Sequence, residues 1–494
     1  MKVMVEKVEH LVRRIRWKLF AVENPTMQKS KETFGFNTSN TPPVNMKLKD
    51  FEEELYEMVK NITFGPVNNE FQSKLKEDIK KIKNSKHILV KADKTRNVYQ
   101  VPVPEYKRLL QNNITKDYKT CEPVQVSNTN SSAKTLTETL ELADRIDKYI
   151  EIDAYITLKD HKDGFPGKID SRLINPAKSN LGKISKRFLE DAVRVIRSKS
   201  GSNQWRSSGE VIDWFQDLPD KDKLTFFKFD IVSFYPSITK KLLTDAIQWA
   251  EKEKHHKFDQ KQMDIIFHAR ESYLFSFGKP WVKQENPKFD VTMGCYDGAE
   301  VCELVGLYIL SELTKVPGLD SVGLYRDDGL GVTKGSGPQI EKLRKDIFKV
   351  FKKINLQITI EANITQTDFL DLWFDLSSSK FRPFRKDNQI PIYINVDSNH
   401  PKTITKQLPN MITDRISKLC SSEETFQNSS VPYQEALHNA GYKDTIKFKK
   451  KVPKTSRKRN RQATWFNPPF SKNVRTPIAK KFLLLVTNIL ETQT

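Results

Sequence analysis

The chain has 494 residues, of which 37% are hydrophobic and 29% charged. This composition excludes a disordered protein, and the length allows roughly two to four packed subdomains. The net charge of +21 favours a polyanionic partner such as nucleic acid. No apolar run approaches the roughly 20 residues that a membrane-spanning helix needs, and the first residues lack the apolar core of a signal peptide. The four cysteines have no spacing typical of a zinc site or a disulfide framework, which fits a reducing compartment.

The first 223 residues combine two kinds of pattern. Residues 1–85 carry helical spacing with many lysines and glutamates, for example at 51–62 and 71–82, which predicts a helical N-terminal extension. Residues 86–223 mix short strand patterns with basic loops. Within them the segment 126–132 is rich in serine and asparagine and predicts an exposed connector.

A single acid lies within an apolar strand pattern at residues 225–234. The aromatic and β-branched residues of this run predict a buried strand that carries Asp230. Pro236 would end the strand, and Ser237 would cap the helix that follows. Because an unpaired charge in so apolar a strand is costly, Asp230 is expected to have a partner. It either caps the next helix or pairs with a lysine, or it is a metal ligand that meets a second acid on a neighbouring strand.

Two adjacent acids mark the segment 322–332, whose pattern predicts a strand, a turn and a second strand. Asp327, Asp328 and Gly329 would supply the tight turn, because Asp and Gly tolerate the backbone angles of such turns. Two neighbouring carboxylates repel each other unless a cation compensates. The pair therefore suggests Mg²⁺ and phosphate chemistry, with a solvated hairpin loop as the alternative. A partner acid at Asp230 favours the metal site.

The pattern around these acids predicts a mixed α+β fold. Helical patterns at 298–313 and 340–354 alternate with strand patterns at 356–361 and 369–376. This order is typical of an antiparallel sheet with helices on one face. After a connector that contains proline and asparagine, helical patterns return, and the apolar run at 482–486 predicts the buried face of a final helix.

Several motifs resemble the reverse transcriptases of Penelope-like retroelements. The Asp-x-x-x-Phe-Tyr run from Asp230 to Tyr235 and the Tyr-x-Asp-Asp hairpin at 325–328 resemble motifs A and C of a reverse transcriptase palm. The other similar segments, in the order of that family, are 157–162, 171–176, 293–306, 393–409 and 465–470. The resemblance covers most of the chain and implies a right-hand polymerase fold.

This resemblance divides the α+β chain into five expected parts. A helical N-terminal extension (1–85) precedes the fingers (86–223) and the palm with its antiparallel sheet (224–376). A connector and helical thumb (377–446) follow, and a basic linker with a C-terminal helix (447–494) comes last.

The resemblance also implies a two-metal site for nucleotidyl transfer. Asp230 and Asp327 would bridge two Mg²⁺ ions, with Mn²⁺ as an alternative, and Asp328 would lie close by. The backbone carbonyl of Ile231 would add a neutral ligand, since Mg²⁺ prefers oxygen. Tyr235 occupies the position where reverse transcriptases place the aromatic ring that blocks a ribose 2′-hydroxyl, which implies a preference for deoxynucleotides.

Further residues would bind the nucleotide. Arg172 matches the motif-2 arginine that the family places on the triphosphate, and a guanidinium grips phosphate bidentately. Lys159 or Lys162 would accompany it, and spacing does not choose between them. Gly294 would permit close backbone approach to template or nucleotide. The motif-D region at 358–367 has no lysine, so the general acid for the leaving pyrophosphate is left unassigned.

Two regions are expected to contact nucleic acid. Phe369 begins a segment that resembles the motif-E primer grip. Nine of the positive charges lie in residues 447–461, and the rest of the chain still carries +12. This basic run would serve nuclear targeting or phosphate contact, or form a solvated linker. Its candidate residues are Lys449, Lys450, Lys451, Arg457, Lys458, Arg459 and Arg461.

The sequence therefore predicts an RNA-directed DNA polymerase, the reverse transcriptase of a Penelope-like retrotransposon, which adds dNTPs to a DNA primer on an RNA template. It would act in the nucleus after synthesis in the cytoplasm. Members of this family often carry a C-terminal GIY-YIG endonuclease; no Gly-Ile-Tyr or Tyr-Ile-Gly occurs here, which predicts a truncated copy or a separate endonuclease partner. One alternative is a DNA-templated DNA polymerase with an Asp-x-x-Ser-Leu-Tyr-Pro-Ser motif, which residues 230–237 resemble. The other is a catalytically inactive, domesticated nucleic-acid-binding protein, and the oligomeric state is left open.

Overall fold

The chain divides into two compact units. The computed structural model describes residues 2–24, 42, 44–66, 70–386, 391–450 and 464–491. The first unit comprises residues 1–85, 391–414 and 432–494, and the second comprises residues 86–390 and 415–431.

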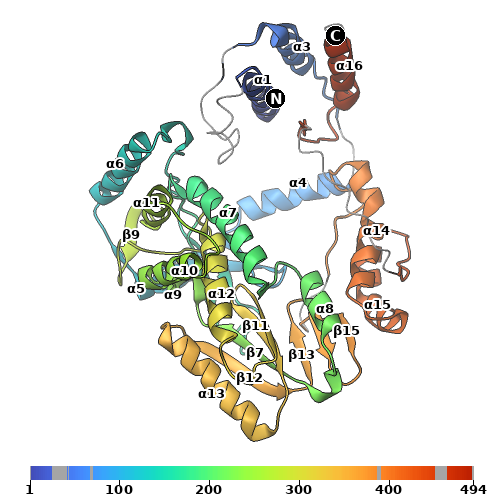
Figure 1. The fold of residues 1–494 in the computed structure, drawn as a ribbon. Coiled ribbons are helices and arrows are strands. Elements are labelled where there is room, and N and C mark those ends of the chain that lie inside the picture. The colour runs from blue at the N-terminus through green and yellow to red at the C-terminus, as the bar shows by residue number, and fades with distance from the viewer. Residues whose placement is uncertain are drawn as a thin grey trace. The chain divides into compact units, whose positions relative to one another are not determined.

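A five-stranded sheet forms the centre of the second unit (Figure 1). Its strand order is β12 (Ile358–Ile364), β7 (Thr225–Ile231), β11 (Asp328–Thr333), β10 (Ser321–Tyr325) and β6 (Asn203–Gln204). Every neighbouring pair is antiparallel except β10 and β6. The strand that carries Asp230 therefore lies between β12 and β11, and β11 forms with β10 the hairpin that contains Asp327 and Asp328, which we call the acidic hairpin. The expected antiparallel sheet is confirmed.

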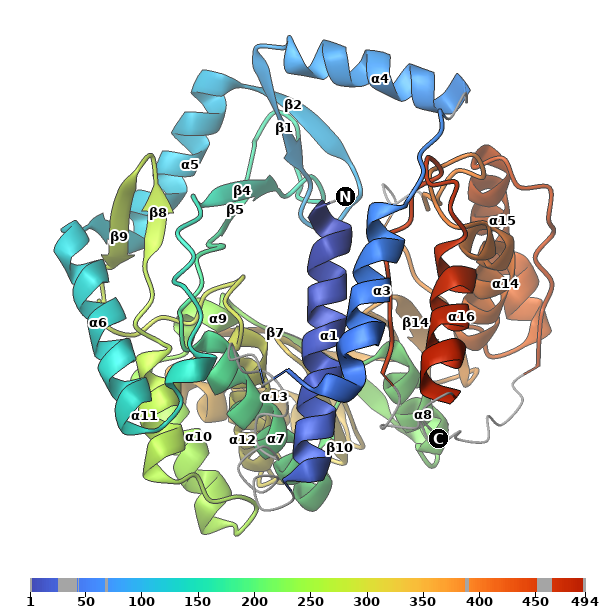
Figure 2. The same ribbon diagram turned by 90° about the horizontal axis from the view of Figure 1, so that it is seen from above.

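Helices cover one face of this sheet (Figures 1 and 2). They are α7 (Gly182–Ser200), α10 (Lys240–Lys252), α12 (Gly298–Leu313) and α13 (Gly337–Lys353). Two of them, α12 and α13, pack on the strands, and α7 and α10 pack against α12. The rings of Phe229 in β7 and Phe351 in α13 meet edge-on with centroids 5.2 Å apart. The result is the expected α+β layer.

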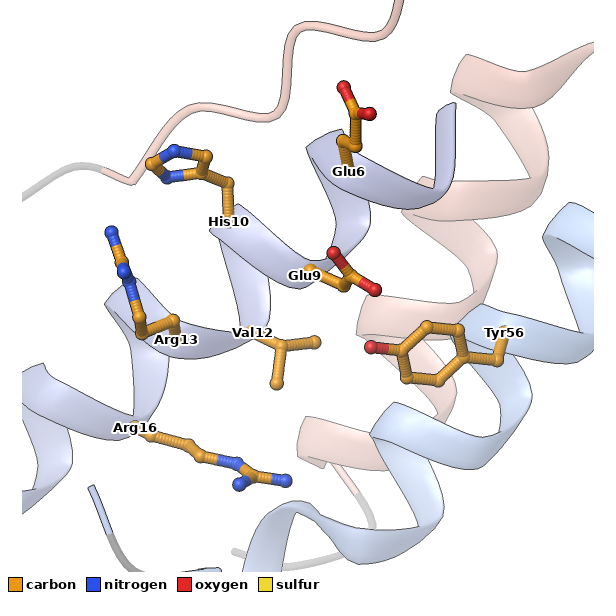
Figure 3. Close-up of a pocket in the computed structure, with 7 residues that line it drawn as sticks. All are labelled: Glu6, Glu9, His10, Val12, Arg13, Arg16 and Tyr56. Carbon is orange, nitrogen blue, oxygen red and sulfur yellow. The ribbon is translucent and has the colours of Figure 1, made fainter. Parts of the chain in front are cut away.

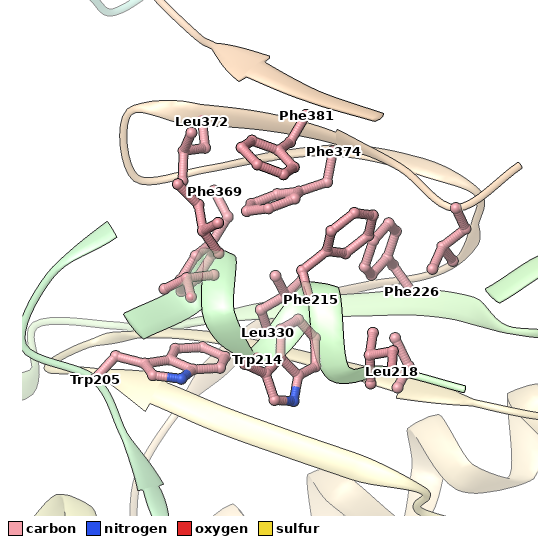
Figure 4. Close-up of a cluster of buried hydrophobic side chains, with 14 of the residues drawn as sticks. Trp205, Trp214, Phe215, Leu218, Phe226, Leu330, Phe369, Leu372, Phe374 and Phe381 are labelled. Atoms are coloured by element: carbon pink, nitrogen blue, oxygen red, sulfur yellow. The ribbon is translucent and has the colours of Figure 1, made fainter. Parts of the chain in front are cut away.

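The other face of the sheet packs at one end against α8 (Ser208–Asp217) and a three-stranded antiparallel sheet. The strands of this small sheet are β13 (Gln366–Phe369), β14 (Leu372–Asp375) and β15 (Lys380–Pro383). Buried side chains fill the space between them (Figure 4). We call this set the aromatic cluster; its rings are Trp205, Trp214, Phe215, Phe226, Phe369, Phe374 and Phe381. The ring of Phe215 lies 4.8 Å from Phe374 and 6.2 Å from Phe226, between centroids.

Two local expectations are wrong. Residues 126–132 lie in helix α6 (Pro123–Thr139) and not in an exposed connector. A proline starts this helix, and its threonine hydroxyls bond to carbonyls one turn earlier, as Thr137 does at 3.0 Å. The single strand expected at 369–376 is instead a hairpin, because the backbone turns at Leu370 with a φ of +56°.

Two hairpins lie side by side in the part of the second unit that precedes β7. One consists of β1 (His87–Lys91) and β2 (Val98–Pro102), the other of β4 (Tyr155–Leu158) and β5 (Ser171–Ile174). A bridge between Ala92 and Leu158 joins them. The remaining elements of this unit are β3 (Tyr118–Thr120), β8 (Leu274–Ser276), β9 (Lys279–Lys283), α5 (Val103–Asp117), α9 (Phe234–Ser237) and α11 (Gln260–His268).

The first unit has its own apolar core between α1 (Lys2–Glu23), α3 (Lys49–Lys60) and α16 (Ile478–Glu491). Val8, Leu55 and Leu485 are buried there, so the final helix is present and buries part of its apolar run. A pocket of about 520 Å³ lies beside α1 and α3 (Figure 3). It is lined by Glu6, Glu9, His10, Val12, Arg13, Arg16 and Tyr56.

Three more helices connect these regions in sequence. α4 (Glu70–Lys83) belongs to the first unit, whereas α14 (Lys402–Lys418) and α15 (Glu423–Asn439) each contribute residues to both units. No helix in the described part of the chain is long and apolar enough to cross a membrane.

Candidate active site

Two acids lie side by side at one end of the five-stranded sheet. Asp230 of β7 and Asp328 of β11 are direct partners in the antiparallel register. Side chains of such partners point to the same face. Asp327 precedes β11, and its carbonyl accepts a hydrogen bond of 2.9 Å from the backbone N–H of Ile231. The structure thus brings together the three acids that the sequence singled out.

The turn of the acidic hairpin differs from the expected one. Tyr325 pairs with Asp328, so the two residues at the turn are Arg326 and Asp327. Arg326 has a φ of +56°, as the first central residue of the favoured two-residue hairpin turns requires. Gly329 belongs to β11 and not to the turn.

Gly329 leaves space for a neighbouring aromatic ring. A Cβ atom at this position would lie 2.1 Å from Cζ of Phe229 on the adjacent strand. Gly331 faces Phe227 in the same way, at 2.2 Å. The glycines after the acid pair are therefore needed for close packing of β11 on β7, on the face opposite the acids.

Like charges dominate the electrostatics of the acid pair. Burial, followed by the charges of Asp327 and Asp230, raises the pKa of Asp328 to about 6. Burial and the charge of Asp327 also raise the pKa of Asp230. Three cations oppose this rise at Asp230, namely Lys94, Lys162 and Arg172. The acids therefore have cations nearby, yet their carboxylates still repel one another.

The donor set of this site suits Mg²⁺. The described residues contain no group of three or more acidic, histidine or cysteine side chains that could by itself hold a metal ion. Proteins usually bind Mg²⁺ through one or two carboxylates together with substrate phosphates and water. Asp230 and Asp328 offer two adjacent carboxylates, and a cation would relieve the repulsion that raises their pKa values. Asp327 and the Ile231 carbonyl remain predicted ligands.

The expected nucleotide-binding cations have different surroundings. Arg172 forms an ion pair of 3.2 Å with Asp93, and Lys159 forms one of 3.1 Å with Asp170. Within the described part of the chain Lys162 forms no such ion pair, yet it lies near enough to Asp230 to lower the pKa of that carboxyl group. Lys162 is therefore the better candidate for the lysine beside the triphosphate.

Sequence reasoning missed two further lysines. Lys94 lies between β1 and β2, and Lys386 follows β15. Both are close enough to lower the pKa of Asp328. Burial, with the charge of Lys94 next, lowers the pKa of Lys386 itself. No local motif marks either lysine, because only the fold brings them to the acids.

A buried carboxylate, Asp160, anchors the loop that carries Lys94. It accepts hydrogen bonds from Asn97 at 3.0 Å and from the Tyr99 hydroxyl at 2.9 Å, and a third from Thr95. Asp160 is only 6% exposed. The loop between β1 and β2 is therefore fixed to the loop that holds Lys159 and Lys162.

Tyr235 and its neighbour Phe234 lie at the start of α9. Phe234 is a buried core residue, as expected, and Tyr235 is 9% exposed. The Tyr235 hydroxyl accepts a hydrogen bond of 2.7 Å from Nη1 of Arg326. The cap of the next helix is Thr239 and not Ser237, since the Thr239 hydroxyl accepts from a backbone N–H of α10.

Gly294 lies against protein backbone. Its φ is +113°, and a Cβ atom there would be 2.5 Å from the carbonyl oxygen of Asn175. The glycine is thus required for contact with the segment after β5, which accounts for it without template or nucleotide.

A few residues later Asp297, at the N-terminus of α12, is buried and forms an ion pair with Arg270 and a hydrogen bond with Ser185. These contacts fix the start of α12.

Phe369, the expected start of the primer grip, is buried. Phe369 is 5% exposed and packs on Trp205, so its ring is part of the aromatic cluster and offers no stacking surface. It lines, with Leu370, Asp230 and Asp328, a pocket of about 150 Å³ beside the acids. The hairpin of β13 and β14 therefore adjoins the site, although the Phe369 side chain supports it from within.

Most of the basic run lies outside the described residues. Lys449 forms an ion pair of 2.9 Å with Asp414, and Lys450 is exposed. The candidates outside the described residues are Lys451, Arg457, Lys458, Arg459 and Arg461.

A sheet with two acids at its end, helices on one face and the small sheet of β13, β14 and β15 beside it is typical of the palm of a right-hand polymerase. The structure resembles telomerase from Candida albicans in complex with a TWJ fragment of telomeric RNA, with a TM-score of 0.51 and 12% identity over 76% of this chain and 68% of that chain. The chain therefore has the right-hand polymerase fold.

Weaker similarities and one family model accompany this match. Apo telomerase from Candida tropicalis, truncated from its C-terminal domain, gives a TM-score of 0.44 at 12% identity, covering 62% of this chain and 65% of that chain, which is just under two thirds of its length. The RNA-dependent RNA polymerase of a human picobirnavirus gives 0.38 at 10% identity, covering 82% and 84%. The animal helix-turn-helix domain model matches residues 392–451, and a search of curated proteins gives no match.

Proposed function

We propose that the protein is an RNA-directed DNA polymerase of the Penelope-like type, which extends a DNA primer with dNTPs on an RNA template. The observation that carries this proposal is the register of β7 and β11, which pairs Asp230 with Asp328 beside Asp327. The right-hand polymerase fold and the Tyr-x-Asp-Asp form of the hairpin support it. A Gly-Asp-Thr-Asp form, expected of the DNA-templated alternative, is absent from this hairpin.

The three acids would hold two Mg²⁺ ions, which supply charge stabilisation for the attacking and leaving oxygens of nucleotidyl transfer. The protein's own cations would bind the triphosphate. Arg172 and Lys162 are each close enough to Asp230 to lower the pKa of its carboxyl group. Cations placed this way bind phosphate oxygens and orient the α-phosphate toward the primer hydroxyl.

Nucleic acid would contact a second region of the chain. The helix-turn-helix model covers α14 and α15, and this match together with the net charge of +21 supports DNA or RNA binding there. We propose the nucleus as the place of action, with the basic run as the targeting segment.

Primer extension tests this function. Purified protein is given a DNA primer annealed to RNA or to DNA template, with dNTPs and Mg²⁺. We expect extension on RNA template, and loss of at least about 10³-fold in Asp327→Ala, because charge stabilisation by a bound metal is worth several kcal/mol. Asp213→Ala is the matched control, since Asp213 is an exposed acid on α8.

The outcomes separate the three candidate functions. Extension on DNA template alone would favour the DNA-templated polymerase. Tight binding of primer-template by a wild type that incorporates no nucleotide on either template would favour the binding protein. Equal extension by wild type and Asp327→Ala would remove the acidic hairpin from the reaction.

A further inference from the structure

The arginine of the acidic hairpin contacts Tyr235. Nη1 of Arg326 donates a hydrogen bond of 2.7 Å to the hydroxyl of Tyr235. The two residues are 91 positions apart in sequence, one on the turn of β10 and β11 and the other in α9. Tyr235 is buried and Arg326 is partly buried, and a hydrogen bond with a charged donor is stronger than one between neutral groups.

The backbone of Arg326 has a strained conformation. Its φ of +56° belongs to the left-handed region, which glycine and asparagine adopt with less strain. A non-glycine residue persists in such a conformation when surrounding contacts fix it. The contact with Tyr235 is such a contact, and the carboxylate of Glu303 on α12 also favours the charged guanidinium.

The Tyr235 ring has little freedom on its other side. A Cβ atom added to Gly298 of α12 would lie 3.5 Å from Cε1 of this ring. Cys302, one turn further along α12, is buried and lies close enough to Tyr235 for the two groups to influence each other's pKa. Tyr235 is therefore held between α12 and the hairpin, and Arg326 supplies the hairpin side.

We propose that Arg326 is a positioning residue that fixes the Tyr235 ring and thereby sets discrimination against ribonucleoside triphosphates. This inference rests on the proposed function. Arg326 is followed directly by Asp327, whose carbonyl binds the N–H of Ile231. The same turn therefore determines where the metal-binding acid and the sugar-excluding ring lie, and a shift of one displaces the other.

A double-mutant cycle tests the inference. The variants are Arg326→Met, which keeps length and loses the donors, Tyr235→Phe, which keeps the ring and loses the acceptor, and the pair together. The readout is the ratio of dNTP to NTP incorporation efficiency. We expect each single variant to lower this ratio about 10-fold, because a hydrogen bond to a charged group has about that effect. The double variant should also lower it about 10-fold and not about 100-fold, because both changes remove one contact.

Three further variants define the limits of the effect. Tyr235→Ala should lower discrimination more than either single variant, since it removes the ring itself. Arg326→Lys should retain part of the discrimination, because an ammonium can still donate one hydrogen bond. Arg344→Met, at an arginine of α13 that pairs with Glu341 on the surface, should leave the ratio unchanged.

Two measurements decide the outcome. Multiplying effects in the double variant, or an Arg326→Met ratio equal to that of wild type, would overturn the inference. The free energy of unfolding of the same variants, measured by chemical denaturation, tests the contact without an activity assay. Additive losses of this free energy in the double variant would show that the contact is absent. If wild type incorporates neither sugar, the proposed function fails and the sugar role fails with it, whereas coupling in unfolding still reports on the contact.

Discussion

On one face of β7 and β11 the two ends of the strands differ in chemistry: one end is apolar and the other is acidic. At one end Phe226 and Val332 are register partners, and both are buried in the aromatic cluster at 0% and 1% exposure. At the other end the partners are Asp230 and Asp328, whose charges repel. Four residues of extended chain, or about 14 Å, separate the ends. Lys228 lies between them and is paired with Asp368 at 2.9 Å.

The apolar end of these two strands therefore stabilises the fold, whereas the acidic end provides the candidate catalytic groups. The apolar end contributes burial, which offsets the electrostatic cost at the acid end. The register partners that stabilise the apolar end therefore lie away from the acids, and the acids oppose folding when no cation is bound. Substitutions at the two ends should have opposite effects on the free energy of unfolding.

The largest change in stability is expected at Phe374→Ala. Phe374 is fully buried and packs against Phe215 with centroids 4.8 Å apart. Truncation of a buried phenylalanine costs about 3–5 kcal/mol through lost burial and an unfilled cavity. Urea denaturation measures this loss, and extension activity per folded molecule should stay within about twofold of wild type.

Trp373→Ala is the matched control on the same strand. Trp373 points to the opposite side, is only partly buried, and stacks with Arg382 at 4.5 Å. Its truncation should cost about 1 kcal/mol. Equal losses at the two positions would show that the aromatic cluster is not the stabilising part of this sheet.

The strands and acids could be predicted from sequence because their signals are local. The apolar run around Asp230 and the symmetric runs flanking Asp327 each mark a strand, and antiparallel pairing then places the acids together. The sequence pattern places the turn one residue too late, because Gly329 leaves space for Phe229 and does not belong to the turn. A glycine in a strand gives the same sequence signal as a glycine in a turn.

The cations around the acids could be predicted only in part. Arg172 was found through a family motif, whereas Lys94 and Lys386 reach the acids through loops 292 residues apart in sequence. Lysines are frequent in this basic chain, so no pattern distinguishes these two. The contact of Gly294 with Asn175 likewise depends on how separate segments pack. Charge neighbours across a fold are set by tertiary structure, which periodicity does not encode.

Asp328→Asn should stabilise the metal-free protein. The pKa of Asp328 is raised from near 4 to about 6, so the folded state favours its protonated form. The stabilisation from that proton is complete below pH 4 and is lost as the pH rises to about 6. At pH 8, with a chelator present, the neutral amide should therefore raise the free energy of unfolding by about 1–3 kcal/mol. Thermal or urea unfolding at pH 4 and pH 8 measures this difference.

The control for this variant is Asp213→Asn, on the exposed face of α8, which should change stability little at either pH. The advantage of Asp328→Asn should vanish at pH 4, where wild-type Asp328 is itself neutral. Added Mg²⁺ should stabilise wild type more than the variant, because binding to the folded state raises its stability. A variant less stable than wild type at pH 8 would show that repulsion between the acids does not destabilise the folded protein.

The smallest effect separates two lysines on one loop. Lys159 forms an ion pair of 3.1 Å with Asp170, whereas Lys162 lowers the pKa of Asp230. Lys162→Ala should raise the KM for dNTPs about 10-fold, in line with the loss of one charge-assisted phosphate contact. Lys159→Ala removes a cation already paired with a carboxylate, so its KM should change less than about threefold. Steady-state extension with varied dNTP concentration gives the KM of both variants. A larger change in KM for Lys159→Ala would show that this loop changes conformation when the nucleotide binds.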